Sequence, residues 1–243
     1  MLKIIAHRGY TANHLENTLE AFKVALDFNA DAIELDVHFT SDNQLVVHHD
    51  YYLGNPDNGE GLIFRKPLSY IQDLTINDKY KIPTLEEVFE LVGNNMQYEL
   101  ELKGFTNEFL QALIAMVQRF KLAKHIEFTS PNVYTLTRLK EIAPDLKTGV
   151  FIAQFPDWMD KELGQTLAMH NALLGGAAVL HCPLDVIDDK FIELARSYNL
   201  QIHAADCNTE EELRLALGVG VDQLSTDELE LALATREKLS AKN

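Results

Sequence analysis

Alternating apolar and polar side chains mark residues 31–40, DAIELDVHFT, as a β-strand whose two faces differ in chemistry. The apolar face carries Ile33, Leu35, Val37 and Phe39. The polar face carries Glu34, Asp36, His38 and Thr40. Such a strand either lies at a sheet edge with its polar face in water, or brings two carboxylates and a histidine into a buried site.

Short apolar runs alternate with amphipathic stretches along the whole chain, which is typical of parallel βαβ units. The strand-like runs are 2–6, 31–39, 44–49, 96–103, 125–130, 147–153, 176–184, 200–207 and 221–226. The helical patterns are 16–28, 84–92, 106–120, 132–142, 188–198, 209–217 and a closing helix from residue 229. Expected helix caps are Thr84 with Glu87, Asn107, and Thr209 with Glu212.

About eight strand–helix units in 243 residues predict an α/β fold, a closed (β/α)8 TIM barrel. No GxGxxG follows the first strand, which makes an open, doubly wound sheet less favoured. Residues 51–83 interrupt the rhythm with turn-rich sequence, and we interpret them as a small flap inserted over one end of the barrel. The prediction is a single domain over residues 1–243 with this one insertion.

Composition narrows the functional classes. A formal net charge of −16 argues against nucleic acid or an anionic membrane as a partner, and no run is long enough for a transmembrane segment. No secretory signal sequence is recognisable, and Cys182 and Cys207 have no metal-binding spacing, so we expect free thiols and a cytoplasmic protein. The sequence does not indicate an oligomeric state. An anionic substrate would need local positive charge in its site.

Polar residues gather where strands of the predicted barrel end, which is where such barrels hold their active sites. The run HRG, residues 7–9, ends the first strand, and HHD, residues 48–50, ends the third extended run. In YELELK the polar face carries Glu99, Glu101 and Lys103. Four carboxylates in a barrel interior would cost several kcal/mol per unpaired ion, so they must hold protons or a cation. Oxygen ligands without cysteine favour Mg²⁺, Ca²⁺ or Mn²⁺, bound by Glu34, Asp36 and a glutamate of YELELK.

The order of these motifs resembles the glycerophosphodiester phosphodiesterase family. The matching elements are HRG, ENT, IELDV, HHD, IPTLEE and E-x-K in the first 103 residues, with FTSPN and GVDQLSTD later in the chain. The resemblance implies a TIM barrel with a short inserted subdomain and one divalent metal ion. It also implies a small glycerophosphodiester as substrate, released as sn-glycerol 3-phosphate and an alcohol.

The resemblance implies a role for individual residues. Glu34, Asp36 and Glu101 match the metal ligands, and His7 and His49 match the two catalytic histidines. Arg8 and Lys103 match positions that face the phosphate, and Glu16 and Asn17 match the rim of the site. We expect His7 to act as the base and His49 as the acid.

Departures from the family pattern fall on the flap and the substrate wall. Leu15 stands where a proline precedes ENT, Ala205 where a tryptophan is usual, and Leu229 where a proline is usual. The arginine–threonine pair expected after HHD is missing. Two alternatives therefore stay open: a lysophospholipase-D-like enzyme acting on a lipid, and an inactive binding protein on the same barrel.

Overall fold

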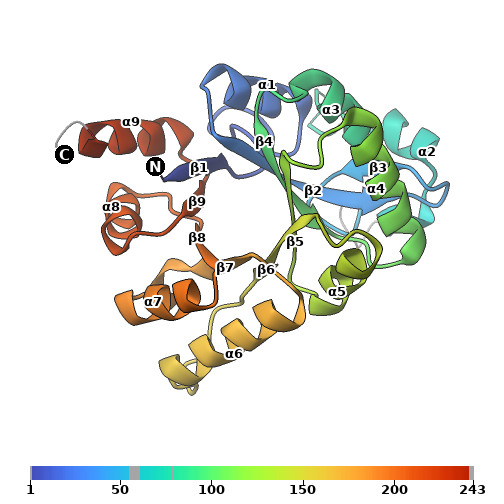
Figure 1. Cartoon of the computed structure of the whole chain (residues 1–243). Helices are drawn as coiled ribbons and strands as arrows, with labels where there is room; N and C mark the ends of the chain where they lie inside the picture. The colour runs from blue at the N-terminus through green and yellow to red at the C-terminus, as the bar shows by residue number, and fades with distance from the viewer. Residues whose placement is uncertain (1, 55–60, 78, 241–243) are drawn as a thin grey trace.

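The structure is a computed structural model and describes residues 2–54, 61–77 and 79–240. Within that part of the chain, strands form a closed ring and helices surround it (Figure 1). The parallel strands are β1 (Lys3–Ala6), β2 (Ala32–Phe39), β4 (Gln97–Leu102), β5 (Ile126–Ser130), β6 (Lys147–Phe151), β7 (Val179–Pro183), β8 (Gln201–Ala205) and β9 (Gln223–Thr226). β1 pairs with both β2 and β9, which closes the barrel. The predicted (β/α)8 TIM barrel is confirmed.

The helices follow the strands in alternation. They are α1 (Leu19–Asp27), α3 (Leu85–Val92), α4 (Asn107–Phe120), α5 (Val133–Ile142), α6 (Lys161–Leu174), α7 (Asp189–Ser197), α8 (Glu210–Val219) and α9 (Leu229–Ser240). Thr84 and Thr209 form the expected capping boxes with Glu87 and Glu212. The expected cap at Asn107 is wrong, because the hydroxyl of the preceding residue, Thr106, accepts the Phe109 N–H and makes Asn107 the first helical residue.

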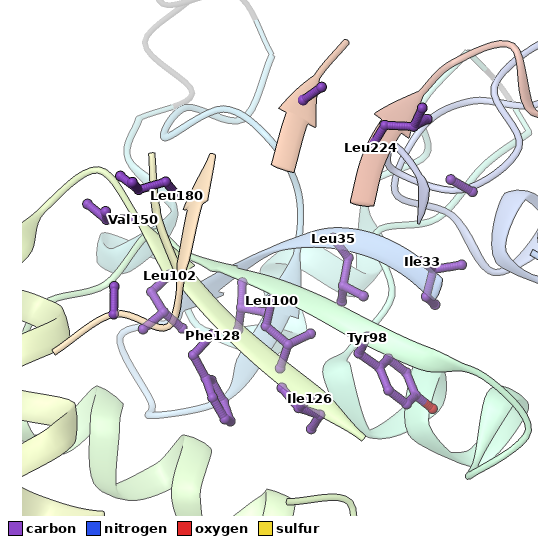
Figure 2. Close-up of a cluster of buried hydrophobic side chains, with 14 of the residues drawn as sticks. Ile33, Leu35, Tyr98, Leu100, Leu102, Ile126, Phe128, Val150, Leu180 and Leu224 are labelled. Carbon is purple, nitrogen blue, oxygen red and sulfur yellow. The ribbon is translucent and has the colours of Figure 1, made fainter. Parts of the chain in front are cut away.

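The apolar faces of the barrel strands point outward to the helices. Figure 2 shows the outer face of β2, β4 and β5, whose buried residues Ile33, Leu35, Tyr98, Leu100, Ile126 and Phe128 belong to the main hydrophobic core. The alternate residues of the same strands therefore face the barrel interior. In many TIM barrels that interior is filled by branched apolar residues. Here β2 and β4 instead bring carboxylates into it, with Glu34 paired in register to Glu99 and Asp36 to Glu101.

The insertion begins after a short strand, β3 (Leu45–Val47), that runs antiparallel to β2 outside the ring. The extended run expected at 44–49 is thus a hairpin partner of β2 and does not contribute a barrel strand. In the described part of the 51–83 segment lie a 3-10 turn, η2 (Ile63–Arg65), and helix α2 (Leu68–Asp73). They pack around a second, smaller core made of Val46, Leu53, Ile63, Ile71 and Ile82. A further 3-10 turn, η3 (Leu184–Val186), follows β7.

Candidate active site

Three carboxylates meet inside the C-terminal end of the barrel. Oxygen atoms of Glu34, Asp36 and Glu101 all lie within 4.8 Å of one another. The exposed fraction is 3% for Glu34 and 0% for Asp36, which excludes a sheet-edge strand with its polar face in water. Register explains the meeting, because β2 and β4 are parallel neighbours and Asp36 stands opposite Glu101.

Two cations compensate part of this charge. The Lys103 ammonium lies 2.9 Å from Asp36 Oδ1 and 2.5 Å from Glu101 Oε1, and the Arg8 Nε lies 3.5 Å from Asp36 Oδ2. Burial disfavours the ionised form of Asp36, but Lys103 and Arg8 outweigh it and hold the pKa of that carboxyl below its usual range. Burial, together with the charge of Asp36, raises the pKa of Glu34 well above its usual value. The cluster is therefore short of positive charge at Glu34.

The turn after β1 is built to reach these carboxylates. Arg8 has a φ of +55°, rare for a residue with a side chain, and its backbone N–H donates to Glu34 Oε2 at 3.0 Å. Gly9 has a φ of +91°, and a Cβ there would lie 2.8 Å from the Cβ of Ala21. Only glycine fits this close approach to α1. The guanidinium of Arg8 also binds Glu16, with 2.9 Å between Nη1 and Oε2.

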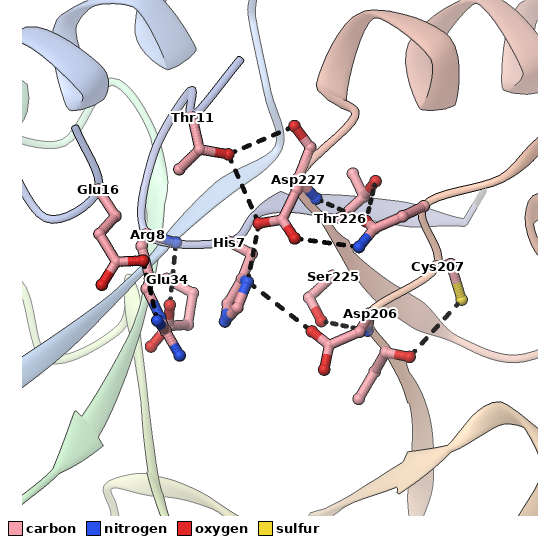
Figure 3. A network of polar contacts seen from close by, with 12 residues as sticks. His7, Arg8, Thr11, Glu16, Glu34, Asp206, Cys207, Ser225, Thr226 and Asp227 are labelled. Atoms are coloured by element: carbon pink, nitrogen blue, oxygen red, sulfur yellow. Dashed lines mark hydrogen bonds and ion pairs between the residues drawn. The ribbon is translucent and has the colours of Figure 1, made fainter. Parts of the chain in front are cut away.

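Each of the two predicted histidines has a carboxylate partner on the same ring nitrogen. His7 Nδ1 lies 3.0 Å from Asp227 Oδ1, and His49 Nδ1 lies 2.9 Å from Asp50 Oδ1 (Figure 3 for His7). A proton on Nδ1 held by the carboxylate leaves Nε2 of each ring for another partner. Burial disfavours protonated His7, but the hydrogen bond to Asp227 outweighs it and raises the pKa of His7.

Asp227 was not among the predicted site residues. It belongs to the GVDQLSTD element near the end of the chain, 220 residues from His7. Asn208 donates to the second oxygen of Asp227 at 3.0 Å, so the carboxylate is itself held in place. The sequence signal was a motif without an assigned role, and only barrel closure between β1 and β9 brings it to His7.

Comparison with known proteins assigns the family. The sequence profile of the glycerophosphoryl diester phosphodiesterase family matches residues 7–231. A glycerophosphodiester phosphodiesterase of Caldanaerobacter subterraneus subsp. tengcongensis is 32% identical over 238 residues, which cover 93% of this chain and 94% of that protein. The chain belongs to the glycerophosphoryl diester phosphodiesterase family. The resemblance noted in the sequence is confirmed, and so is the prediction of a phosphoric diester hydrolase.

Solved structures of similar proteins have the same fold as this family member. A putative glycerophosphoryl diester phosphodiesterase from Agrobacterium tumefaciens superposes with a TM-score of 0.87 at 22% identity, covering 99% of both chains. A phosphodiesterase from Oleispira antarctica, solved in complex with the product sn-glycerol-3-phosphate, has a TM-score of 0.80 at 24% identity. That comparison covers 97% of this chain and 96% of the Oleispira chain.

The two residues predicted at the rim of the family's site lie at different depths. Glu16 is partly exposed and binds Arg8. Asn17 is buried, and its side chain brackets Asp36: Nδ2 donates to Asp36 Oδ2 at 2.8 Å, and Oδ1 accepts the Asp36 N–H at 3.3 Å. With a φ of +56°, Asn17 is held in the left-handed region that asparagine tolerates better than most residues.

The fourth carboxylate of the predicted group does not join the other three. Glu99 lies two residues before Glu101 on the same face of β4. It forms a separate cluster with His181 and His203, in which one ligand atom from each residue lies within 4.8 Å of the others. The structure places both histidines deep in the barrel interior, with exposed fractions of 1% and 0%. Burial raises the pKa of Glu99 to about 7 and lowers that of His203 to about 4.

A cavity of about 430 Å³ lies against Glu16 and Asp227, the residues that contact Arg8 and His7. Its walls come from the loops after β1, β3 and β9 and from Ile76 of the insertion; the residues are Thr11, His14, Leu15, Glu16, His48, Ile76 and Asp227. Leu15, one of the departures from the family pattern, therefore lies in the wall of this cavity.

Among the helices that the structure describes, none is long and apolar enough to cross a membrane. Cys182 and Cys207 are free and buried, as expected.

Proposed function

We propose that this chain hydrolyses glycerophosphodiesters to sn-glycerol 3-phosphate and an alcohol, with one divalent metal ion and two histidines. The family assignment supports phosphodiester cleavage, and the Oleispira relative is described with sn-glycerol-3-phosphate as its product. The observation that carries the proposal is the cluster of three carboxylates, two of them buried, at the barrel end that also carries two histidines whose Nδ1 atoms each contact an aspartate.

The donor set of Glu34, Asp36 and Glu101 fits a hard divalent cation. All three ligands are carboxylate oxygens, the preferred donors of Mg²⁺, Ca²⁺ and Mn²⁺. Burial and the neighbouring carboxylates raise the pKa of Glu34, and a bound cation would favour its ionised form. When bound, such an ion supplies Lewis-acid stabilisation of charge on the phosphate oxygens. Asn17 then acts as a positioning residue that holds Asp36, and only Glu16 remains at the substrate rim.

Arg8 and Lys103 supply local positive charge in a chain of net charge −16. Burial disfavours the charged form of Lys103, but Asp36 and Glu101 outweigh it and raise the pKa of this ammonium. It therefore stays charged at neutral pH. We assign both side chains to the non-bridging oxygens of the phosphate, where charge-assisted hydrogen bonds are strongest.

The histidines divide the proton transfers. In our assignment, His7 Nε2 removes a proton from the nucleophile, because the Asp227 contact makes His7 a stronger base. His49 Nε2 gives a proton to the leaving alcohol oxygen, with Asp50 holding the ring through Nδ1. The nucleophile is either water or the 2-hydroxyl of the glycerol group, which would form a cyclic phosphate first.

Exposed aromatic residues favour a lipid substrate as the second candidate. Tyr51, Tyr52 and Phe64 are solvent-exposed on the insertion, immediately after His49 and Asp50 in the chain. They could hold the acyl chain of a lysophospholipid, as a lysophospholipase-D-like enzyme requires. An inactive binding protein remains the third reading, which the retained carboxylates and histidines disfavour.

One assay separates these candidates. Release of sn-glycerol 3-phosphate from glycerophosphocholine and glycerophosphoethanolamine is measured with Mg²⁺, Ca²⁺, Mn²⁺ or EDTA, with lysophosphatidylcholine as a parallel substrate. Metal-dependent release that EDTA abolishes is the expected result. Cleavage of the lysophospholipid alone would favour the lipid reading, and folded protein inactive on every substrate would favour the binding protein.

A further inference from the structure

The barrel holds a second cluster of possible metal ligands, one layer nearer its N-terminal end than the carboxylates of the active site. Glu99 comes from β4, His181 from β7 and His203 from β8. Their exposed fractions are 2%, 1% and 0%. The Nδ1 atoms of His181 and His203 each lie 3.3 Å from a carboxylate oxygen of Glu99. These two contacts go to different oxygens of Glu99, and one ligand atom from each of the three residues lies within 4.8 Å of the others.

Each of the three residues leaves one side-chain atom without a hydrogen-bond partner. These atoms are Glu99 Oε2, His181 Nδ1 and His203 Nε2. An unpaired buried polar atom costs about 1–3 kcal/mol, and native proteins contain few of them. His203 Nδ1 lies 3.2 Å from Gln223 Nε2, so Nε2 is the nitrogen that this ring leaves for a ligand. Unpaired atoms on three side chains that meet in one cluster indicate a site for a ligand that they share.

The surrounding residues orient the cluster as they would around a metal ion. His181 Nε2 lies 2.7 Å from Glu127 Oε1, the arrangement in which a metal-binding histidine gives its second ring nitrogen to a carboxylate and turns Nδ1 toward the ion. Lys147 in turn binds Glu127, with 2.8 Å between Nζ and Oε2. A Cβ on Gly149 would lie 2.5 Å from His181 Nε2 and 2.6 Å from Glu127 Oε1, so this pair needs glycine beside it.

A cavity at the N-terminal end of the barrel reaches one residue of this cluster, Glu99. It has a volume of about 230 Å³, and its lining includes Lys3, Glu99, Glu127, Lys147 and Gln223. Glu99 and Glu127 are thus reached from the side opposite to the active site. An ion could enter here without passing Glu34, Asp36 and Glu101.

We propose that Glu99, His181 and His203 form a second metal site, for a divalent transition metal ion such as Zn²⁺. Two imidazoles and one carboxylate suit Zn²⁺ and its neighbours in the first transition row, whereas the oxygen-only set above suits Mg²⁺, Ca²⁺ or Mn²⁺. The ion takes the Glu99 carboxylate, Nδ1 of His181 and a ring nitrogen of His203. It ties β4 to β7 and β8 across the barrel, and the proposal does not depend on the reaction assigned to the upper cluster.

Metal analysis of the full chain tests the proposal. The protein is stripped with a chelator, dialysed against excess Mg²⁺ to fill the oxygen site, and then dialysed against Zn²⁺ before elemental analysis. One tightly bound Zn²⁺ per chain is expected, with affinity reduced at least about a hundredfold in H181Q and in H203Q. The matched control D36N, which damages the oxygen site, should retain this Zn²⁺. The proposal is overturned if the folded wild type binds no Zn²⁺, or if both histidine variants bind Zn²⁺ as tightly as the wild type does.

X-ray absorption on Zn²⁺-loaded wild-type protein gives a test that needs no variant to fold. Scattering from imidazole ligands is expected, and a coordination shell of oxygen atoms without imidazole contradicts the site. Neither measurement uses hydrolysis as its readout. Failure of the glycerophosphodiester assay and failure of this proposal are therefore separate results.

Discussion

Glu101 and Glu99 stand two residues apart on the same face of β4, yet they belong to clusters with different chemistry. The upper cluster combines Glu101 with two more carboxylates and with the cations Arg8 and Lys103. The lower cluster combines Glu99 with the imidazoles of His181 and His203, and the ion pair of Glu127 and Lys147 lies behind His181. A cavity of about 430 Å³ is lined by Glu16, which contacts Arg8 of the upper cluster, and a smaller one of about 230 Å³ is lined by Glu99 of the lower cluster.

The difference shows how one strand can serve two sites. Position along the strand selects the layer, and the neighbouring strands in that layer decide which donors surround the carboxylate. β2 places Asp36 opposite Glu101 and Glu34 opposite Glu99, while β7 and β8 bring His181 and His203 to Glu99 alone. Catalytic turnover should therefore depend on the upper layer, and the stability of the barrel should depend on the lower one.

Replacing a carboxylate of the upper cluster should give the largest loss of activity. D36N removes the carboxylate that contacts Lys103, Arg8 and Asn17, and so disorganises the metal ligands and the phosphate-binding cations together. Turnover of glycerophosphocholine should fall at least about a thousandfold, since a metal ion supplies several kcal/mol of transition-state stabilisation. The lower-layer variant H203Q should stay within about tenfold of wild type. Equal losses in the two variants would mean that the layers are not functionally distinct.

Loss of the predicted acid should have the next largest effect. H49A removes the ring that Asp50 orients, while the three carboxylates stay in place. We expect turnover at least about a hundredfold lower, with Mg²⁺ affinity unchanged by calorimetric titration. H170A, on the exposed surface of α6, is the control and should behave as wild type. Near-normal turnover of H49A would remove His49 from the mechanism.

The pairing of His7 with Asp227 predicts a shift in pH dependence. Asp227 raises the pKa of His7, and a general base works only when deprotonated, so the acidic limb of kcat/KM reports that raised pKa. In D227N the pKa of His7 falls, and the limb should move to lower pH while turnover drops at least about tenfold because the ring loses its orientation. D206N is the matched control: Asp206 lies 3.7 Å from His7 Nδ1 and should shift the limb less. A limb that stays in place in D227N would show that another group controls it.

Local sequence patterns were enough to predict the fold and the upper cluster. Alternation with a period of two placed Glu34 and Asp36 on one face of the strand at 31–39. The E-x-K motif placed Glu101 and Lys103 on one face of the strand at 96–103. Helix α6, Lys161–Leu174, was missed because Gly164 and polar residues interrupt its apolar pattern; Gly164 is needed where the Phe155 ring packs against the helix. The Asn107 cap was wrong by one residue.

Contacts between distant strands could not be found in the same way. Asp227 meets His7 only because β9 pairs with β1, and His181 and His203 meet Glu99 only because the closed ring turns all three inward. Sequence spacing of about 80 and 100 residues carries no information on such a meeting without the register of every strand between. The sequence therefore indicated that Glu99 lies in the barrel interior but not which residues it would meet there.

The smallest expected effect comes from a lower-layer substitution that should lower stability without changing turnover. Lys147 is the cation that contacts the buried carboxylate of Glu127, and its own side chain is 35% exposed, so solvent already screens part of the pair. K147M should lower the free energy of unfolding by about 1 kcal/mol, a drop of about 2–4 °C in Tm, because Glu127 then keeps only its histidine and glutamine partners. Turnover should not change. K23M, which breaks an exposed helix pair with Asp27, is the control and should cost at most about 0.5 kcal/mol. A loss of turnover in K147M without a loss of stability would place the lower layer in the chemistry and contradict the division of the barrel into two functional layers.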